Sequence, residues 1–149
     1  MICTFFGHKD TPSKIKAQLK SEILNAISMG VKEFYVGNNG SFDLLVQGTL
    51  YELLNEEHSF KLNIVLSYVG EKAISGHQEY TLFPCGQEDC LPKFAIAKRN
   101  RWLIEKSNVV IAYLKNKGTN TDKIISSAKR RGLCIINIYK QGQKTKTLQ

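Results

Sequence analysis

The chain of 149 residues is long enough to bury the core of one domain without disulfide or metal cross-links. Its 42% hydrophobic content is ordinary for a globular protein, and no apolar stretch approaches the roughly 18 residues of a membrane span, so we expect no membrane association. A net charge of +8, from 21 Lys and Arg against 13 Asp and Glu, favours anionic partners such as nucleotides or nucleic acid. Residues 1–7 lack the basic and apolar segments of a secretion signal, so we expect a cytoplasmic protein.

Strand-like and helix-like patterns alternate along the chain. Apolar, β-branched runs predict strands at 2–6, 31–36, 62–69, 108–114 and 133–139, and apolar residues at helical spacing predict helices at 12–29, 41–57, 92–106 and 121–131. The alternation predicts right-handed β-α-β units in a single-domain α/β fold, with a parallel sheet of about five strands and helices on both faces. We expect the domain to span residues 1–139, followed by a flexible basic tail at 140–149.

Residues 70–92 form a long polar connection in this pattern. A connection of that length without predicted structure is usually functional or mobile, and either an interface or a lid fits it. It contains Cys85, Cys90 and His77, but C-x4-C with one distant histidine lacks the paired spacing of a structural zinc site. We therefore expect no metal centre.

The loop after the second expected strand has the composition of an anion-binding turn. Glycines permit close backbone approach, and the helix that follows offers unpaired N–H groups to an anion. In parallel α/β sheets ligands bind beyond the carboxyl ends of the strands, where this loop lies. The alternative is an ordinary strand-to-helix turn. The candidate ligand-binding residues here are Gly37, Asn38, Asn39, Gly40, Ser41 and Asp43.

Two further loops follow strands at the same predicted edge. Gly7 and His8 come after the first strand, and Gly118 and Thr119 come after the fourth. His8 suits phosphate contact or acid–base chemistry, although a histidine at a helix entry is more often structural or solvated. We count all four residues as candidates for the ligand site.

The helix expected at 92–106 concentrates cations around the one tryptophan, in the segment 98–102. Helical geometry predicts a buried face made of two apolar pairs, Ile96 with Leu103 and Ala97 with Ile104. Asn100 projects between these pairs, so we expect it to point inward, where it either ties down a loop or orients a ligand or the neighbouring cations. Arg101 borders the predicted buried face and is the stronger candidate for an ordered anion contact. Arg99 lies on a separate flank with Lys106 and is kept as a second candidate, and we expect one of the two arginines to be only a solvated surface charge.

Three motifs in order resemble a known family. The segments Cys3–His8, Phe34–Asp43 and Phe94–Ile104, followed by Asn108–Tyr113, are similar to the bacterial YpsA-like branch of the SLOG superfamily. The resemblance extends from residue 2 to about residue 139. The superfamily also contains the LOG phosphoribohydrolases and the DprA/Smf DNA-processing proteins. The resemblance implies a Rossmann-like sheet that binds nucleotides or nucleotide-derived signals at the strand ends.

One motif departs from the enzymes of that superfamily. LOG enzymes carry P-G-G-x-G-T-x-x-E, in which the glycines hold phosphate and the glutamate serves catalysis. The corresponding segment 117–122 keeps one Gly-Thr pair, Gly118-Thr119, and has Asp122 in place of the glutamate. The resemblance therefore implies ligand binding more strongly than hydrolysis.

We expect a binding module for a nucleotide or nucleotide-derived signal, acting as a sensor or a sequestering protein. Phosphates would lie against backbone N–H groups of the three glycine-containing loops, with Arg101 and Arg99 supplying charge. Asp43 or Asn100 would meet ribose hydroxyls. We expect no cofactor, and we expect a homo-oligomer because α/β domains of this size commonly self-associate.

Two other functions remain as alternatives. A phosphoribohydrolase-like enzyme would cleave the N-glycosidic bond of a nucleoside monophosphate and needs a carboxylate such as Asp122, Asp43 or Glu105 near the sugar. Nucleic-acid binding ranks last, because the cations are spread over helix flanks and the tail without interleaved exposed aromatic residues.

Overall fold

Six parallel strands form one sheet in the computed structural model, which describes residues 1–139. The predicted basic tail, 140–149, lies outside the described residues. The strands are β1 (Ile2–Gly7), β2 (Glu33–Val36), β3 (Lys61–Val65), β4 (Thr81–Leu82), β5 (Val109–Tyr113) and β6 (Cys134–Asn137). The α-helices are α1 (Lys16–Ser28), α2 (Gly40–Asn55), α3 (Ala95–Lys106) and α4 (Asn120–Arg130).

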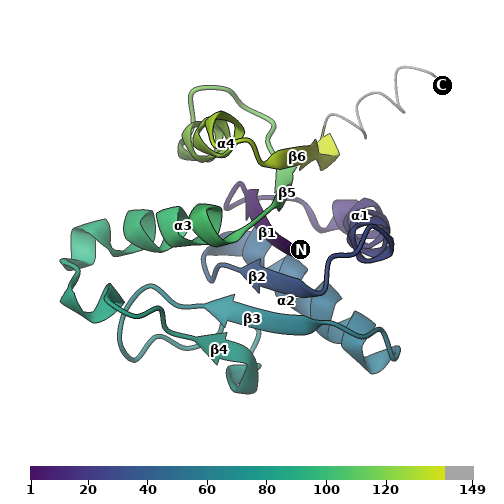
Figure 1. The fold of residues 1–149 in the computed structure, drawn as a ribbon, viewed down its shortest axis with the longest axis horizontal. Helices are drawn as coiled ribbons and strands as arrows, with labels where there is room; N and C mark the ends of the chain where they lie inside the picture. The colour runs from purple at the N-terminus through teal and green to yellow at the C-terminus, as the bar shows by residue number, and fades with distance from the viewer. Residues whose placement is uncertain (140–149) are drawn as a thin grey trace.

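The strands lie in the order β4-β3-β2-β1-β5-β6, and every neighbouring pair is parallel. Figure 1 shows this order from the bottom of the view to the top. The chain moves outward from β1 to β4 and then returns to place β5 on the other side of β1. The order therefore reverses at β1, which makes the carboxyl ends of β1 and β5 the topological switch point where open α/β sheets bind ligands.

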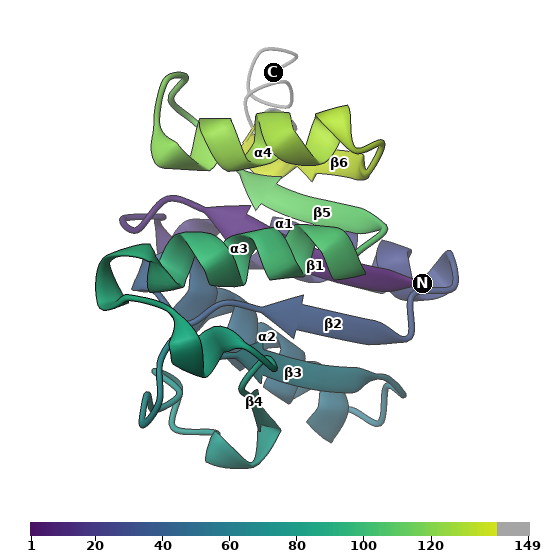
Figure 2. The same cartoon turned by 60° about the vertical axis from the view of Figure 1, so that its left-hand side comes forward.

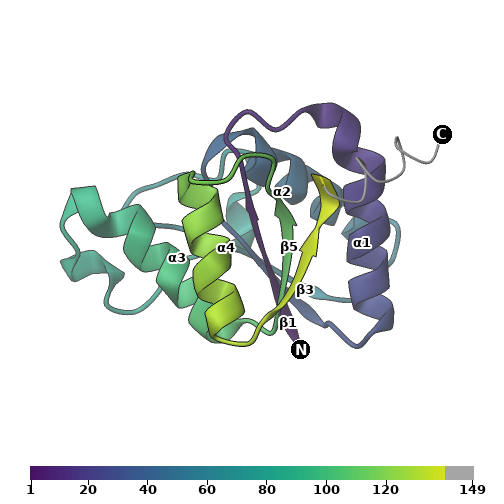
Figure 3. The ribbon, with the colours of Figure 1, turned by 90° about the horizontal axis from the view of Figure 1, so that it is seen from above.

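Two helices cover each face of the sheet. In Figure 2, α3 and α4 cross in front of the strands while α1 and α2 lie behind them, and Figure 3 shows α1 and α4 on opposite sides. The alternation within β1 explains this arrangement, because successive side chains of a strand point to opposite faces. Phe5 packs with the α1 and α2 side, and Phe6 packs with the α3 and α4 side. The predicted α/β fold with helices on both faces is confirmed, and the architecture is Rossmann-like.

The sheet has six strands rather than the five expected. The additional strand, β4, lies within the connection at 70–92 and pairs two residues, Thr81 and Leu82, with the end of β3. A two-residue strand carries too little periodicity to be recognised in a sequence. The third strand is also shorter than expected, since β3 ends at Val65 and the chain turns at Ser67.

No helix within residues 1–139 is long and apolar enough to cross a membrane.

Candidate functional site

Three predicted loops meet at the carboxyl edge of the sheet. Ser41, in the first turn of α2, donates a hydrogen bond from its backbone N–H to the carbonyl of Lys9, over 2.8 Å, and its hydroxyl reaches the same carbonyl. His8 accepts a hydrogen bond at Nε2 from the backbone N–H of Lys115, over 2.9 Å. Thr121 donates from its hydroxyl to the carbonyl of Gly7, over 3.4 Å. The loop after β1 therefore touches both the loop after β2 and the loop after β5.

Glycine is required where these loops approach one another. Gly40 has a φ of +86°, and a Cβ atom there would lie 2.8 Å from Cα of Lys9. A Cβ on Gly7 would lie 2.3 Å from the ring of Phe42. The backbone of Lys9 therefore accounts for Gly40, and the ring of Phe42 accounts for Gly7.

Three of the backbone N–H groups expected to hold phosphate are occupied from within the chain. The N–H of Asn39 donates to Oδ2 of Asp43 over 2.8 Å, and that of Ser41 donates to Lys9. The N–H of Gly118 donates to Oδ2 of Asp122, again over 2.8 Å. These three groups are therefore not free to bind a ligand.

The motif at 118–122 forms a helix cap. The hydroxyl of Thr119, the residue before α4, accepts a hydrogen bond from the N–H of Asp122, while the carboxylate of Asp122 accepts the N–H of Gly118. This pattern is a variant of the capping box, in which the side chain at the third helical position accepts the N–H of the residue before the cap, Gly118, rather than that of the cap itself. The structure thus gives Asp122 a structural role at α4.

Asn38 joins α2 to the connection at 70–92. Its Nδ2 donates to Oε2 of Glu71 over 2.6 Å and to the carbonyl of Lys72 over 2.7 Å. Its Oδ1 accepts from the N–H of Ile74 over 2.8 Å and from Nε2 of Gln47 over 3.1 Å. Both ends of the buried amide are fully used, so Asn38 positions the connection and has no donor left for a ligand.

The buried arginine of α3 is Arg99, with 2% of its surface exposed. Its Nη1 donates to the carbonyl of Val65 at the end of β3 over 2.9 Å, and its Nη2 donates to Oδ1 of Asn39 over 2.8 Å. Its Nε donates to Oδ1 of Asn100 over 3.0 Å. Arg99 therefore links α3, the carboxyl end of β3 and the loop after β2.

The predicted orientation of α3 is wrong in two respects. Arg101, expected at the border of the buried face, is exposed, whereas Arg99 is the buried arginine. Ile96 and Ala97, expected to be buried with the rest of the apolar face, are exposed. The cause is that the first half of α3 packs against the polar connection rather than the sheet, and Gln87 seals that contact by donating to the carbonyl of Ala95 over 2.7 Å.

The pKa of Asp43, a buried carboxyl group at this edge, is changed by its surroundings. Asp43 is 9% exposed, and burial raises its pKa from 3.8 to about 6. The N–H of Asn39 and the positive charge of Arg99 oppose that rise, while the charge of Glu71 adds to it. A carboxyl group that changes protonation near neutral pH can exchange a proton with a bound molecule.

Gly37 lies between the two charged groups. A Cβ atom on Gly37 would be 2.8 Å from Oδ2 of Asp43 and 3.4 Å from Cζ of Arg99. The absence of a side chain at this position therefore allows the carboxylate and the guanidinium to approach each other.

Asn38, Asp43 and Arg99, with the residues that surround them, form a buried charged network. Three members of this network were not identified from the sequence: Gln47, Glu71 and Gln87. Glu71 is buried and accepts from the N–H and the hydroxyl of Ser67, each over 2.8 Å. Gln87 donates to the carbonyl of Ser67 over 2.7 Å. Their partners lie many residues away or inside the connection, and no periodic pattern marks such pairs. The unusual length and polarity of the connection were the only signal available.

Exposed cations surround the meeting point of the loops. Lys9 follows β1, and Lys115 and Lys117 follow β5, and all three side chains are exposed. These lysines outnumber the exposed carboxylate of Asp10 beside Lys9 and place positive charge at the carboxyl edge, which suits an anionic ligand.

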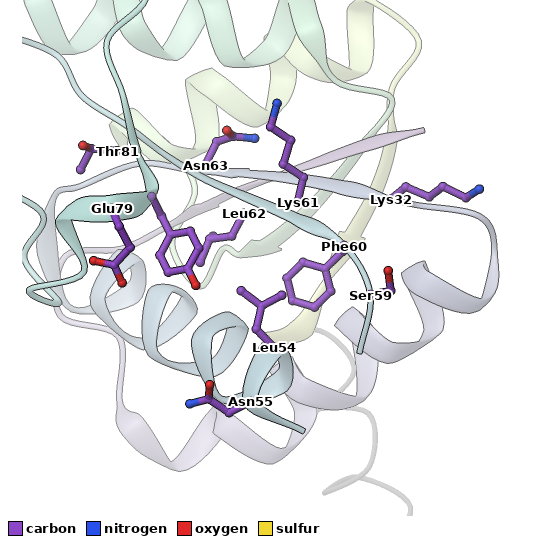
Figure 4. A pocket seen from close by; sticks show the side chains of 11 residues that line it. Lys32, Leu54, Asn55, Ser59, Phe60, Lys61, Leu62, Asn63, Glu79 and Thr81 are labelled. Carbon is purple, nitrogen blue, oxygen red and sulfur yellow. The ribbon is translucent and has the colours of Figure 1, made fainter. Parts of the chain in front are cut away.

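A groove of about 950 Å³ lies elsewhere, along the amino-terminal half of β3 (Figure 4). Leu54, Phe60 and Leu62 contribute apolar surface to this groove, and Lys32 and Lys61 also line it. None of the candidate site residues lines it. The groove is thus separate from the charged network at the carboxyl edge.

The protein is thus a Rossmann-like α/β protein. A buried network of charged and polar side chains lies beneath the loops at the carboxyl ends of its strands. The sequence matches no protein-family model and no curated protein at a significant level.

Proposed function

We propose that the protein binds a nucleotide or a nucleotide-derived signalling molecule at the carboxyl edge of its sheet, as a sensor or a sequestering protein of the SLOG type. The observation that supports this most is that two buried charged groups, Arg99 and Asp43, lie close enough beside the loop after β2 for the charge of each to affect the pKa of the other. Burial of charged groups costs free energy, and groups with a shifted pKa are concentrated at functional sites.

The exposed donors around this network fit a phosphorylated ligand. Lys9, Lys115 and Lys117 supply positive charge at the switch point, where the order of strands reverses. His8 holds the loop after β5 through its contact with Lys115 and so shapes the rim. Because three of the loop N–H groups already have internal acceptors, side chains would supply part of the contacts to the phosphate.

The test is a nucleotide screen with matched lysine variants. Thermal unfolding is followed with AMP, GMP, CMP, UMP and their cyclic forms, since a ligand that binds only the folded state raises its stability. Mass spectrometry of small molecules retained by the purified protein widens the search. We expect at least one nucleotide to raise the melting temperature, and Lys117→Ala to weaken that effect.

Lys61→Ala is the matched control, because Lys61 is an exposed lysine in the groove of Figure 4, away from the proposed site. Its response to nucleotide should equal that of the wild type. If no nucleotide changes the melting temperature and none is retained, the proposed function is wrong.

Asp43 supports a second candidate, the hydrolysis of an N-glycosidic bond. A carboxyl group with a pKa near 6 can donate a proton to a departing base at neutral pH, whereas Asp122 is engaged in the cap of α4. Chromatography of nucleoside monophosphates after incubation with the protein measures release of free base. Release by the wild type and its loss in Asp43→Asn would support this candidate, and no release from any monophosphate would dismiss it.

A further inference from the structure

The two nitrogens of Arg99 that would bind phosphate together already donate hydrogen bonds within the protein. Nε and Nη2 lie on one edge of the guanidinium plane, the edge that commonly grips carboxylate or phosphate in two parallel hydrogen bonds. Here that edge donates to two side-chain amides, Nη2 to Oδ1 of Asn39 over 2.8 Å and Nε to Oδ1 of Asn100 over 3.0 Å. With 2% exposure and a third bond to the carbonyl of Val65, Arg99 is held inside the protein.

This contact fixes the orientation of both asparagines. Arginine has only donors, so each amide must turn its oxygen toward Arg99 and its Nδ2 away. Within residues 1–139 neither Nδ2 group donates a hydrogen bond, and both asparagines are partly exposed. Asn38 is the contrast, since its Nδ2 is used twice inside the protein.

We infer that Asn39 and Asn100 form a paired-amide subsite for the phosphate of the ligand, and that Arg99 is a positioning residue that orients them without touching the ligand. The inference rests on the proposed function and names the part of the ligand that this subsite recognises. Phosphate oxygens accept hydrogen bonds, and the Nδ2 groups of Asn39 and Asn100 are donors with no acceptor within residues 1–139. The charge of Arg99 behind the amides adds attraction for an anion.

A change from asparagine to aspartate tests the subsite directly. In Asn39→Asp the oxygen that accepts from Arg99 is kept, and the presented N–H₂ group becomes a negatively charged oxygen. Asn100→Asp makes the same exchange on α3. Binding of AMP and of inorganic phosphate is measured by calorimetry, and folding is checked by the melting temperature. We expect each variant to fold and to bind AMP at least about tenfold more weakly.

Asn55→Asp is the matched control. Asn55 is exposed at the end of α2 and lines the groove of Figure 4, away from the proposed site, so this variant makes the same exchange of amide for carboxylate without changing Asn39 or Asn100. We expect its affinity for AMP to stay within about threefold of the wild type, because an exposed charge is screened by salt. Equal weakening in Asn55→Asp and Asn39→Asp would show that net charge alone is responsible and would overturn the subsite.

A double-mutant cycle separates positioning from direct contact. Arg99→Lys keeps the charge and loses the fork, and Asn39→Ala removes the amide. If Arg99 acts through Asn39, both changes remove the same interaction. The double variant should then have about the same affinity for AMP as the single variant with the lower affinity. Losses that multiply would show that Arg99 touches the ligand itself and would refute the positioning role.

The outcomes distinguish this inference from the function on which it rests. AMP binding by the wild type that is unchanged in Asn39→Asp and in Asn100→Asp overturns the subsite and leaves the proposed function standing. No binding of AMP, GMP, CMP, UMP, their cyclic forms or phosphate by the wild type, with no nucleotide retained by the purified protein, overturns both. Weakening in the two aspartate variants, with the control unaffected, supports the subsite.

Discussion

Replacing Arg99 with alanine should destabilise the fold more than any other change of a charged residue on α3. The guanidinium makes three hydrogen bonds, to Val65, Asn39 and Asn100, and is 2% exposed. Its removal leaves a strand carbonyl and two amide oxygens without their donor, and leaves buried Asp43 without its positive neighbour. Leaving a buried acceptor without its donor costs about 1–3 kcal/mol, so we expect the loss of all three hydrogen bonds of Arg99 to cost about 3–5 kcal/mol in total.

That loss is large compared with the total stability of a natural domain, about 5–15 kcal/mol. At about 2–4 °C per kcal/mol for a chain of this size, the melting temperature should fall by about 10 °C. Urea unfolding followed by circular dichroism measures the free energy directly. Arg101→Ala, on the exposed side of the same helix, is the control and should change stability by no more than about 0.5 kcal/mol. Equal effects of the two substitutions would refute the assignment of Arg99 as the buried arginine.

The remaining predictions concern other parts of the carboxyl edge. The pKa of Asp43 rises from 3.8 in the unfolded chain to about 6 in the folded protein. Between pH 3.8 and about 6 the folded state therefore binds one more proton than the unfolded state. The contribution of Asp43 to the free energy of unfolding consequently falls by about 3 kcal/mol as pH rises through this range. The stability of Asp43→Asn relative to the wild type should therefore increase from pH 4 to pH 7, and a constant difference would contradict the shift. Gly37→Ala should destabilise the fold by about 1–3 kcal/mol, because its Cβ atom would lie 2.8 Å from the carboxylate of Asp43. Gly48→Ala in α2 should instead stabilise the fold by about 0.5–1 kcal/mol in urea unfolding, because no atom lies within 4 Å of the added Cβ. Asp122→Ala should cost about 1 kcal/mol through loss of the α4 cap, and thermal unfolding unchanged from the wild type would dismiss the capping role.

Helix α3 shows where sequence periodicity stops being sufficient. The spacing of its residues fixes which side chains share a face, and Leu103 and Ile104 are buried as that spacing indicates. Periodicity does not fix what lies beside each turn. The first half of α3 meets the polar connection, so Ala95 and Arg99 face inward there while Ile96 faces solvent. Which of the two arginines is buried, Arg99 or Arg101, therefore depended on the packing around α3 and not on its periodicity.

The alternation of apolar runs with helical spacing determined the parallel α/β sheet, and the loops at Gly7, Gly37 and Gly118 were placed on one edge because parallel strands end together. These features follow from local patterns that each segment carries in its own sequence. The partners of the charged network were decided only in the tertiary structure. Arg99 meets Asn39 sixty positions away, and Asn38 meets Glu71 across thirty-three, as hydrogen bonds between segments that only folding brings together. Such contacts leave no periodic signal, so the sequence predicted the edge of the sheet, and only the tertiary structure decided which residues form the charged network there.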